Sequence, residues 1–327
     1  ISKNYGYSTK VVHQALQYLA SLGVLSPEDK KGYRVISLFG SQLPSSIETI
    51  VFLMGSDAPI HSSSTYQLIL GCLNDEIRQK GKSMHVLESK GFSSDIIVEK
   101  IKSMNASGII LERCETDIVE ALMNLNIPMI YIDSWSESLK VDSVTQDGQL
   151  GGMQAVRYLH KRGIKEIAWF GREVFEVHST DRFSGFLAEL YHLNIKFNSN
   201  LIYHVNDGNE YQKAKELLLR KPKAIICLWR QWASVIQEVA LELGLEIGKD
   251  FELVSWCQEI EYEVFSKITF KGNPPPTIVW DTNAMISNAL SRLQERKKNP
   301  NLSAVRIKVP TQLIPRNIKT IKKIKNK

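Results

Sequence analysis

Tryptophan side chains gather where short apolar runs of the chain end, and their type and spacing suit ligand binding. All six tryptophans lie between positions 135 and 280. Five of them follow or end a predicted strand: Trp135, Trp169, Trp229, Trp256 and Trp280. An indole face packs on the C–H surface of a sugar ring or on a planar base, while a few polar groups fix the orientation. The pattern predicts a flat-walled binding cleft. Tryptophans that only cap a hydrophobic core are the alternative.

Two polar residues also stand at predicted strand ends. Ser56 follows the apolar run that ends at Met54, and Asp133 follows the run that ends at Ile132. In open α/β sheets, ligands bind beyond the carboxyl ends of the strands. We therefore expect Ser56 and Asp133 to contribute polar contacts to the same cleft.

The opening 36 residues have the spacing of a DNA-binding element. Ser8 is a favourable N-cap, the apolar residues after it recur at helical intervals, and a short hairpin with a basic tip follows. This segment carries five basic residues against two acidic ones. A helix fits the major groove, and nearby cations neutralise phosphate. We predict a winged helix-turn-helix, with an ordinary amphipathic helix pair and a solvated basic turn as the alternative.

Each part of the predicted head has its own contacts with DNA. The first turn of the helix would face base edges, and the hairpin would contact the backbone or the minor groove. The residues expected to contact DNA are Ser8, Thr9, Lys10, His13, Lys31, Tyr33 and Arg34.

Sequence marks of catalysis are missing from the chain. It contains no phosphate-binding glycine loop of the G-x-x-x-x-G-K-[ST] type, no G-x-S-x-G and no H-E-x-x-H. Its four cysteines stand far apart, without the spacing of a metal site, so we expect small buried hydrophobes. We predict that the protein is not an enzyme and has no cofactor or metal. A carbohydrate-modifying enzyme is the alternative with the least support.

The elements that position these residues follow a regular alternation from Glu48 onward. Apolar runs of strand length alternate with amphipathic helical segments, as a parallel sheet covered on both faces requires. This pattern predicts an α/β protein with two doubly wound parallel sheets. The predicted strands are Thr49–Met54, Met84–Leu87, Gly108–Leu111, Pro128–Ile132, Ile167–Phe170, Leu201–His204, Ala224–Leu228, Glu252–Ser255, Thr277–Val279 and one near Val305–Val309.

The 327 residues, 43% of them hydrophobic, suffice for about two domains with real cores. We expect a partial winged-helix domain over residues 1–36, a linker rich in serine over 37–47, and a bilobed effector-binding domain over 48–316. The expected first lobe comprises about 48–147 and 277–302, and the expected second lobe about 148–276 and 303–316. Residues 316–327 carry six basic residues and no acidic one, so 317–327 is expected to be a basic tail.

Two family resemblances support this organisation. The first segment resembles the winged helix of GntR-type regulators, through Ser8, Thr9, Val11, Leu19, Gly23 and Gly32. Residues 48–316 resemble the periplasmic-binding-like effector domain of the LacI/GalR family, through Asp147, Gly152, Ala155, Leu159, Gly163, Ile167, Phe170, Gly171, Arg182, Gly185, Pro310, Leu313, Ile314 and Arg316. The whole is similar to chimeric repressors such as the arabinose-responsive regulators of some bacteria.

The effector-domain resemblance implies two ligand contacts, and the chain departs from the family pattern at two other positions. It implies that Asp147 contacts the ligand and that Arg182 grips a sugar hydroxyl or a carboxylate. Trp229-Arg230 stands where the family usually has Asn-Asp, and Ser255-Trp256-Cys257 where it usually has Gly-aromatic-Asp. These changes favour an anionic or flatter ligand, or a sugar held mainly by stacking. The predicted effector-binding residues are Asp147, Arg182, Trp229, Arg230, Trp256, Trp280, Trp135, Asp133 and Ser56.

The combined interpretation is a bacterial transcription regulator, expected to be a repressor. It would bind operator DNA with the head and a sugar-like or anionic planar metabolite in the cleft, as a cytoplasmic homodimer. No run of about 18 apolar residues and no signal-peptide pattern is found, so no membrane partner is expected. A solute-binding protein without a role in DNA binding is the principal alternative.

Overall fold

The computed structural model describes residues 8–21, 25–28, 32–35, 48–55, 64–172, 177–206 and 208–316. The chain divides into two units, one comprising residues 1–48 and 81–83 and the other the remainder. Four predicted features lie outside the described ranges: Lys31, Ser56, the linker over 37–47 and the tail over 317–327. Within the described ranges, no helix has both the length and the apolar character needed to cross a membrane.

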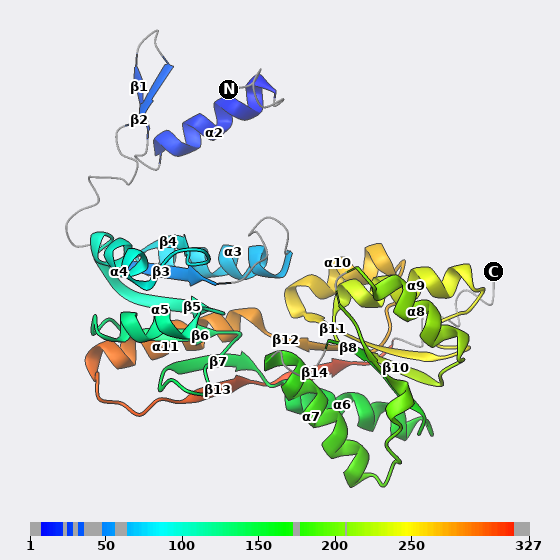
Figure 1. The fold of residues 1–327 in the computed structure, drawn as a ribbon. Helices are drawn as coiled ribbons and strands as arrows, with labels where there is room; N and C mark the ends of the chain where they lie inside the picture. The colour runs from blue at the N-terminus through cyan, green and yellow to red at the C-terminus, as the bar shows by residue number, and fades with distance from the viewer. Residues whose placement is uncertain are drawn as a thin grey trace. The chain divides into compact units, whose positions relative to one another are not determined.

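The first unit contains the predicted helix and hairpin, drawn in blue in Figure 1. Helix α2 (Thr9–Ser21) begins directly after Ser8, whose Oγ accepts a hydrogen bond from the Val11 amide at 3.3 Å. Strands β1 (Leu25–Glu28) and β2 (Gly32–Val35) pair antiparallel. The second strand starts at Gly32, where φ is +97°, a conformation that glycine adopts without strain. The order of helix and hairpin predicted from the sequence is confirmed.

The second unit contains two six-stranded sheets, each dominated by parallel pairs (Figure 1). The first sheet has the order β13-β7-β6-β5-β3-β4 and the second β14-β12-β11-β10-β8-β9, in which β14 runs antiparallel to β12. The predicted fold class is therefore confirmed. The strands are β3 (Thr49–Met54), β4 (Ser83–Glu88), β5 (Ala106–Glu112), β6 (Met129–Ile132), β7 (Asp142–Gln146), β8 (Ile167–Gly171), β9 (Ile202–His204), β10 (Ala224–Cys227), β11 (Glu252–Gln258), β12 (Thr277–Trp280), β13 (Arg306–Val309) and β14 (Thr311–Ile314).

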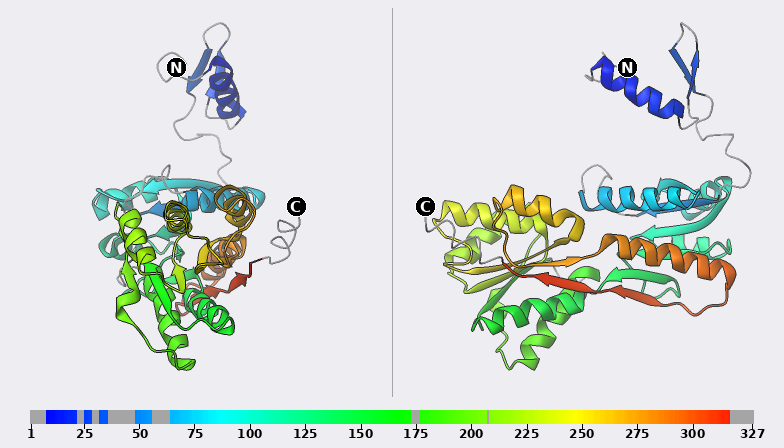
Figure 2. Two further views of the ribbon diagram at one scale, coloured as in Figure 1. Left: turned by 90° about the vertical axis from the view of Figure 1, so that its right-hand side faces the viewer. Right: turned by 180° about the vertical axis from the view of Figure 1, so that it is seen from behind.

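Helices cover both faces of each sheet (Figure 2). In β3, Phe52 belongs to the cluster that includes Ile69 of α3, whereas Val51 and Leu53 pack with Ile97 of α4. This alternation is the period of two expected for a strand that is buried on both faces. The helices are α3 (Ser64–Gln79), α4 (Ser94–Ser103), α5 (Thr116–Met123), α6 (Gly148–Lys161), α7 (Val177–His192), α8 (Glu210–Leu219), α9 (Arg230–Glu242), α10 (Glu259–Thr269) and α11 (Thr282–Lys298), with a short 3₁₀ turn, η1 (Ser199–Leu201).

The expected division of the chain between the lobes is wrong for the two strands that flank α11. Strand β12 pairs with β11 in the second sheet, and β13 pairs with β7 in the first. The chain thus adds β12 to the second sheet before α11 and β13 return to the first lobe, and β14 then crosses back to complete the second sheet. The sequence pattern marked strands and helices but contained nothing that assigns an edge strand to one sheet or the other.

Two strands and one helix were not predicted, and several predicted strand ends differ from the observed ones. Strands β7 and β14 and helix α10 are additional. Strand β11 continues to Gln258, so Trp256 lies inside it, and Trp169 lies in the middle of β8. These two tryptophans therefore do not follow their strands. Their side chains are almost completely buried.

Candidate functional site

The side chain of Arg182 occupies the carboxyl edge of the second sheet. It comes from α7 and is completely buried. Its Nη1 donates a hydrogen bond to the carbonyl oxygen of Leu228 at 2.6 Å, and its Nη2 donates to Oε1 of Gln146 at 2.8 Å. A guanidinium stays charged in proteins, so these charge-assisted hydrogen bonds offset part of its desolvation cost.

Indole rings surround the same guanidinium. Its central carbon lies 4.3 Å from the ring centroid of Trp229, 4.3 Å from that of Trp256 and 5.9 Å from that of Trp280. A weakly hydrated, planar guanidinium gains cation–π attraction when it is desolvated against aromatic faces. We call these four residues the arginine–indole cluster. The structure thus brings together one predicted cation and three of the predicted tryptophans.

Gln146, which the sequence analysis missed, connects the cluster to the first sheet. It is the last residue of β7 and is almost completely buried. Its Oε1 also accepts a hydrogen bond from the indole Nε1 of Trp256 at 3.0 Å, and its Nε2 donates to Oδ1 of Asp133 at 3.3 Å. One amide side chain therefore links Asp133 of the first lobe to Arg182 of the second. The polar run Thr145-Gln146-Asp147 was the available signal.

Asp133 makes a second connection between the lobes. It is buried beyond the end of β6, with φ at +49°. Its Oδ2 lies 3.5 Å from Nε2 of His178, a residue of α7, and the His178 ring meets Trp229 edge-on at 6.3 Å between centroids. His178, which lies in the first turn of α7, was not predicted from the sequence.

Glycines allow α6 and α7 to approach closely enough to place Arg182. A Cβ on Gly152 would lie 2.3 Å from the backbone oxygen of Arg182, and one on Gly185 would lie 2.0 Å from that of Gln149. A Cβ on Gly151 would lie 2.4 Å from Cη2 of Trp256. Any larger residue would push the helices apart or displace the indole. The glycine positions of the family resemblance thus have a steric reason.

A cavity of about 560 Å³ lies at the carboxyl ends of β5 and β6, and we call it the hydroxyl pocket. It contains a side chain from each lobe, because His178 reaches it from α7. Its lining residues are Arg113, Cys114, Thr116, Tyr131, Ser134, Trp135, Ser136, Glu137, Ser138 and His178.

The lining of the hydroxyl pocket combines five hydroxyl groups with one indole. Trp135 is held by Arg306, whose guanidinium carbon lies 4.0 Å from the ring centroid. Ser134 donates a hydrogen bond from Oγ to the carbonyl oxygen of Ile132 at 3.1 Å, which fixes its orientation. Burial raises the pKa of Cys114 to about 12, and its Sγ donates to the carbonyl oxygen of Leu53 at 3.3 Å. The thiol therefore stays neutral, and the pocket offers hydroxyls and a flat apolar wall.

Two predicted effector contacts have local partners instead. Asp147 caps α6 by accepting a hydrogen bond from the Leu150 amide at 3.0 Å, and its Oδ1 lies 3.8 Å from Nζ of Lys308. Nη2 of Arg230 lies 3.0 Å from Oε1 of Glu261. A cap and an ion pair are sufficient structural reasons for both residues. Their contact with a ligand stays a prediction.

The predicted DNA-contacting residues of the first unit are exposed on one helix turn and one strand. Thr9, Lys10 and His13 lie on the exposed first turns of α2, and Arg34 is exposed on β2. The His13 and Tyr33 rings stand 6.4 Å apart in an edge-on arrangement, so helix and hairpin are in contact. The unit therefore presents hydroxyl, imidazole and cationic groups together.

Comparison with known proteins shows what the chain is similar to. The family model of the periplasmic binding protein-like domain matches residues 156–317. The HTH-type transcriptional regulator RegA of Clostridium saccharobutylicum is 22% identical over 305 residues, which cover 90% of this chain and 82% of RegA.

Solved structures show the same fold. A regulatory protein of the LacI family from Chloroflexus aggregans superposes with a TM-score of 0.71 at 20% identity, over 82% of this chain and 97% of that one. The transcriptional regulator CelR in complex with cellobiose gives a TM-score of 0.71 at 16% identity, over 95% of this chain and 91% of that one. The expected periplasmic-binding-like architecture is thereby confirmed.

Proposed function

We propose that this chain, whose effector region has the fold of the LacI-type transcription regulators, is a regulator that binds operator DNA with its first unit and a small-molecule effector with its second. Its similarity to RegA extends over 90% of its length and so includes more than the effector region. We further propose that it represses transcription from the cytoplasm, in keeping with relatives that are named as transcription regulators.

The observation that carries the effector role is the hydroxyl pocket. Hydroxyl side chains exchange hydrogen bonds with ligand hydroxyls, and the Trp135 indole offers a flat surface for a ring. A cavity of about 560 Å³ is of the size that small-molecule ligands occupy. A sugar or sugar derivative matches this lining, and Arg113 would donate hydrogen bonds to an acidic group on such a ligand.

The position of the pocket also explains how an effector could regulate the protein. It contains Trp135 of the first lobe and His178 of the second, and His178 touches Asp133. An effector bound there contacts both lobes and therefore prefers one arrangement of them. Differential affinity for two arrangements is all that a ligand needs to shift their populations.

The head is proposed to be a GntR-like winged helix, as in the arabinose-responsive chimeric repressors. Helix α2 is followed by an antiparallel hairpin, and a hairpin in this place is the wing of such a domain. The exposed Thr9, Lys10 and His13 would face base edges, and Tyr33 and Arg34 would face the backbone or the minor groove.

A second copy of the chain is the proposed protein partner. Helix α10 leaves Ile260, Val264 and Ile268 exposed by 44%, 57% and 75%, at intervals of four residues. Such a stripe is suited to the self-complementary contact of a twofold dimer, and two heads are needed for a palindromic site. Val264→Glu should therefore give a monomer in analytical ultracentrifugation, whereas Leu219→Glu, a matched change on exposed α8, should leave the dimer intact.

The effector role is tested by calorimetric titration of the purified chain with cellobiose, L-arabinose, ribose and gluconate. One of these should bind, and Trp135→Ala should weaken it about tenfold, because an aromatic contact is worth about 1 kcal/mol or more. Tyr191→Ala, which removes an exposed ring on α7, should not change the affinity. If Trp135→Ala does not change the affinity, the effector binds elsewhere. Hypoxanthine is titrated as a comparison ligand, and binding of hypoxanthine alone would exclude a sugar effector.

The DNA-binding role is tested with a duplex selected by the protein from a random pool. Lys10→Gln and Arg34→Gln should each weaken binding for all sequences and reduce the slope of log K against log salt by about 1. Lys215→Gln, an exposed change on α8, should leave the slope unchanged. Failure to select any duplex would favour the solute-binding alternative.

A further inference from the structure

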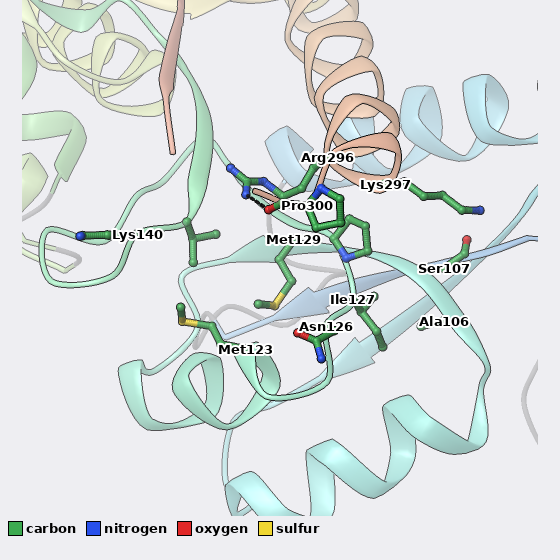
Figure 3. Close-up of a pocket in the computed structure, with 12 residues that line it drawn as sticks. Ala106, Ser107, Met123, Asn126, Ile127, Met129, Lys140, Arg296, Lys297 and Pro300 are labelled. Carbon is green, nitrogen blue, oxygen red and sulfur yellow. Dashed lines mark hydrogen bonds between the residues drawn. The ribbon is translucent and has the colours of Figure 1, made fainter. Parts of the chain in front are cut away.

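A second cavity, of about 580 Å³, lies at the amino ends of the first-sheet strands, the edge opposite the hydroxyl pocket (Figure 3). We call it the amino-edge pocket. Its residues come from the start of β5, the segment between α5 and β6, the segment before β7, and the end of α11 with the turn beyond it. They are Ala106, Ser107, Met123, Asn126, Ile127, Pro128, Met129, Lys140, Val141, Arg296, Lys297 and Pro300.

The floor of the amino-edge pocket is apolar and adaptable. Met123 and Met129 are among its lining residues (Figure 3), together with Ile127 and Val141. Met123 leaves 40% of its surface exposed at the end of α5. Thioether side chains adjust to ligands of irregular shape, which makes such a floor suitable for an acyl or aryl group.

The rim of this pocket is cationic. Lys140, Arg296 and Lys297 border it, and none of the residues known to line it is acidic. Lys140 and Lys297 stand at opposite sides of the opening (Figure 3). A mouth lined by charges of one sign attracts ligands of the opposite sign.

Hydrogen bonds hold the central cation of the rim in place. Nε of Arg296 donates to Oδ2 of Asp142 at 2.6 Å, and its Nη1 donates to the carbonyl oxygen of Pro300 at 3.2 Å. Asp142 is shared with Arg292, whose Nε lies 3.1 Å from the same Oδ2. Arg292 also pairs with Glu295, whose Oε2 lies 3.0 Å from its Nη1, so two carboxylates balance the two guanidiniums, and Lys140 and Lys297 add further positive charge to the rim.

We propose that the amino-edge pocket binds an amphipathic carboxylate, with its acyl or aryl body on the methionine floor and its carboxylate toward the Lys140, Arg296 and Lys297 rim. This ligand differs from the hydroxyl-rich effector proposed above and binds at the other edge of the sheet.

The pocket also touches the point at which the chain enters the second unit. Ser107 lines it and donates a hydrogen bond from Oγ to the carbonyl oxygen of Thr49 at 3.0 Å. Thr49 is the first residue of β3 and the first residue of the second unit. A bound carboxylate therefore lies next to the residue that fixes the start of β3.

The test is calorimetric titration of the full chain with octanoate, at concentrations far below those at which it forms micelles. Octanoate should bind saturably, and 1-octanol, which has the same chain without the charge, should bind at least tenfold more weakly. Lys140→Glu combined with Lys297→Glu should also weaken octanoate at least tenfold. Lys215→Glu on exposed α8, which makes the same charge change far from this lining, should have no effect.

A filling variant keeps the test independent of charge. Met123→Trp places a larger group on the floor at an exposed position and should block octanoate without unfolding the chain, as circular dichroism would check. No saturable binding of octanoate, or equal binding to the charge-reversal variant, would overturn the proposal. Loss of octanoate binding in Trp135→Ala would overturn it as well, because the ligand would then occupy the hydroxyl pocket. None of these measurements depends on DNA or a sugar.

Discussion

The two lobes bury a charge at opposite edges of their sheets. In the second lobe, Arg182 is buried at the carboxyl edge, under the indoles of Trp229 and Trp256. In the first lobe, Asp142 is buried at the amino end of β7, where Arg292 and Arg296 bind its carboxylate. The sheets have similar topologies, but at these two positions they bury charges of opposite sign.

This difference teaches that a repeated fold does not repeat its binding chemistry. At the carboxyl edge, the second sheet meets its own Arg182 and tryptophans, whereas the first sheet borders the hydroxyl pocket. The first lobe would therefore supply most of the hydrogen-bonding groups for the proposed effector. The second lobe would supply His178.

The largest expected effect is that of removing Arg182. Arg182→Ala leaves the carbonyl oxygen of Leu228 without its Arg182 donor, removes one of two donors to Gln146 and opens a space between indoles, so we expect a loss of about 4 kcal/mol in the free energy of unfolding. Chemical denaturation measures it. Arg220→Ala on the surface should cost less than about 1 kcal/mol. A loss that small for Arg182→Ala would mean that the arginine–indole cluster does not stabilise the second lobe.

The matching change in the first lobe is Asp142→Asn. It removes a buried carboxylate from two guanidiniums, and we expect a loss of about 3 kcal/mol at neutral pH. Burial alone would raise the pKa of Asp142, but hydrogen bonds from Arg296, Arg292 and the Val305 amide hold it below its ordinary value of 3.8.

The lowered pKa of Asp142 gives that prediction a pH dependence. The stabilisation is complete above the ordinary pKa and disappears as the pH falls through the lower pKa of the folded protein. The stability difference between wild type and Asp142→Asn should therefore shrink below about pH 4. A constant difference from pH 7 to pH 3, measured by urea denaturation, would show that ionisation of Asp142 has no role.

A smaller effect is expected where α6 and α7 meet. Gly185→Ala drives a methyl group into the backbone of Gln149, so the helix pair that carries Arg182 must separate, at a cost of about 2 kcal/mol. Gly71→Ala in exposed α3 meets no atom and should stabilise the protein by about 0.5–1 kcal/mol. Thermal unfolding of both variants should shift in opposite directions. A shift in the same direction would contradict the steric reason given for Gly185.

The smallest effect concerns effector affinity. Thr116→Val removes one hydroxyl from the hydroxyl pocket while keeping its shape, and we expect about fivefold weaker binding of the sugar ligand, since one hydrogen bond contributes about 1 kcal/mol. Calorimetry measures the change. Ser103→Ala, an exposed hydroxyl at the end of α4, serves as the control and should leave affinity unchanged. Equal affinity in Thr116→Val would indicate that the ligand does not reach α5.

Apolar periodicity predicted most of the fold, because buried strands and amphipathic helices differ in the spacing of their hydrophobic residues. It could not predict β7, which reads Asp-Ser-Val-Thr-Gln and is completely buried. Its polar ends are satisfied by partners far away in sequence, Arg296 for Asp142 and Arg182 for Gln146. A hydropathy pattern contains no information about such long-range pairs of polar residues.

Helix α10 was missed for a different reason. Its sequence begins EIEYEVF, in which apolar and acidic residues alternate as they would in a half-buried strand. The helix keeps Phe265 buried and leaves Ile260, Val264 and Ile268 exposed. Apolar residues that stay exposed on a helix do not follow the spacing expected of residues that pack into a core, so the sequence pattern did not predict this helix.

The site was predicted only in part. The guanidinium of Arg182 lies close to the rings of Trp229, Trp256 and Trp280, because parallel strands end at a common edge. The hydroxyl pocket was represented in the prediction only by Trp135. Serine and threonine residues are common in loops for local reasons, so their convergence around one cavity becomes visible only in three dimensions.

Strand β7 has a mechanical consequence. Its five residues place Asp142 and Gln146 at the two ends of a strand roughly 13 Å long, where Asp142 binds Arg296 and Gln146 binds Arg182. Because both ends of this strand are held by hydrogen bonds, a tilt of the strand at one end changes the position of the other end. A displacement at one end of β7 would be expected to reach groups near the other, since Asp142 binds Arg296 of the amino-edge pocket and Gln146 binds Asp133, which neighbours His178 of the hydroxyl pocket.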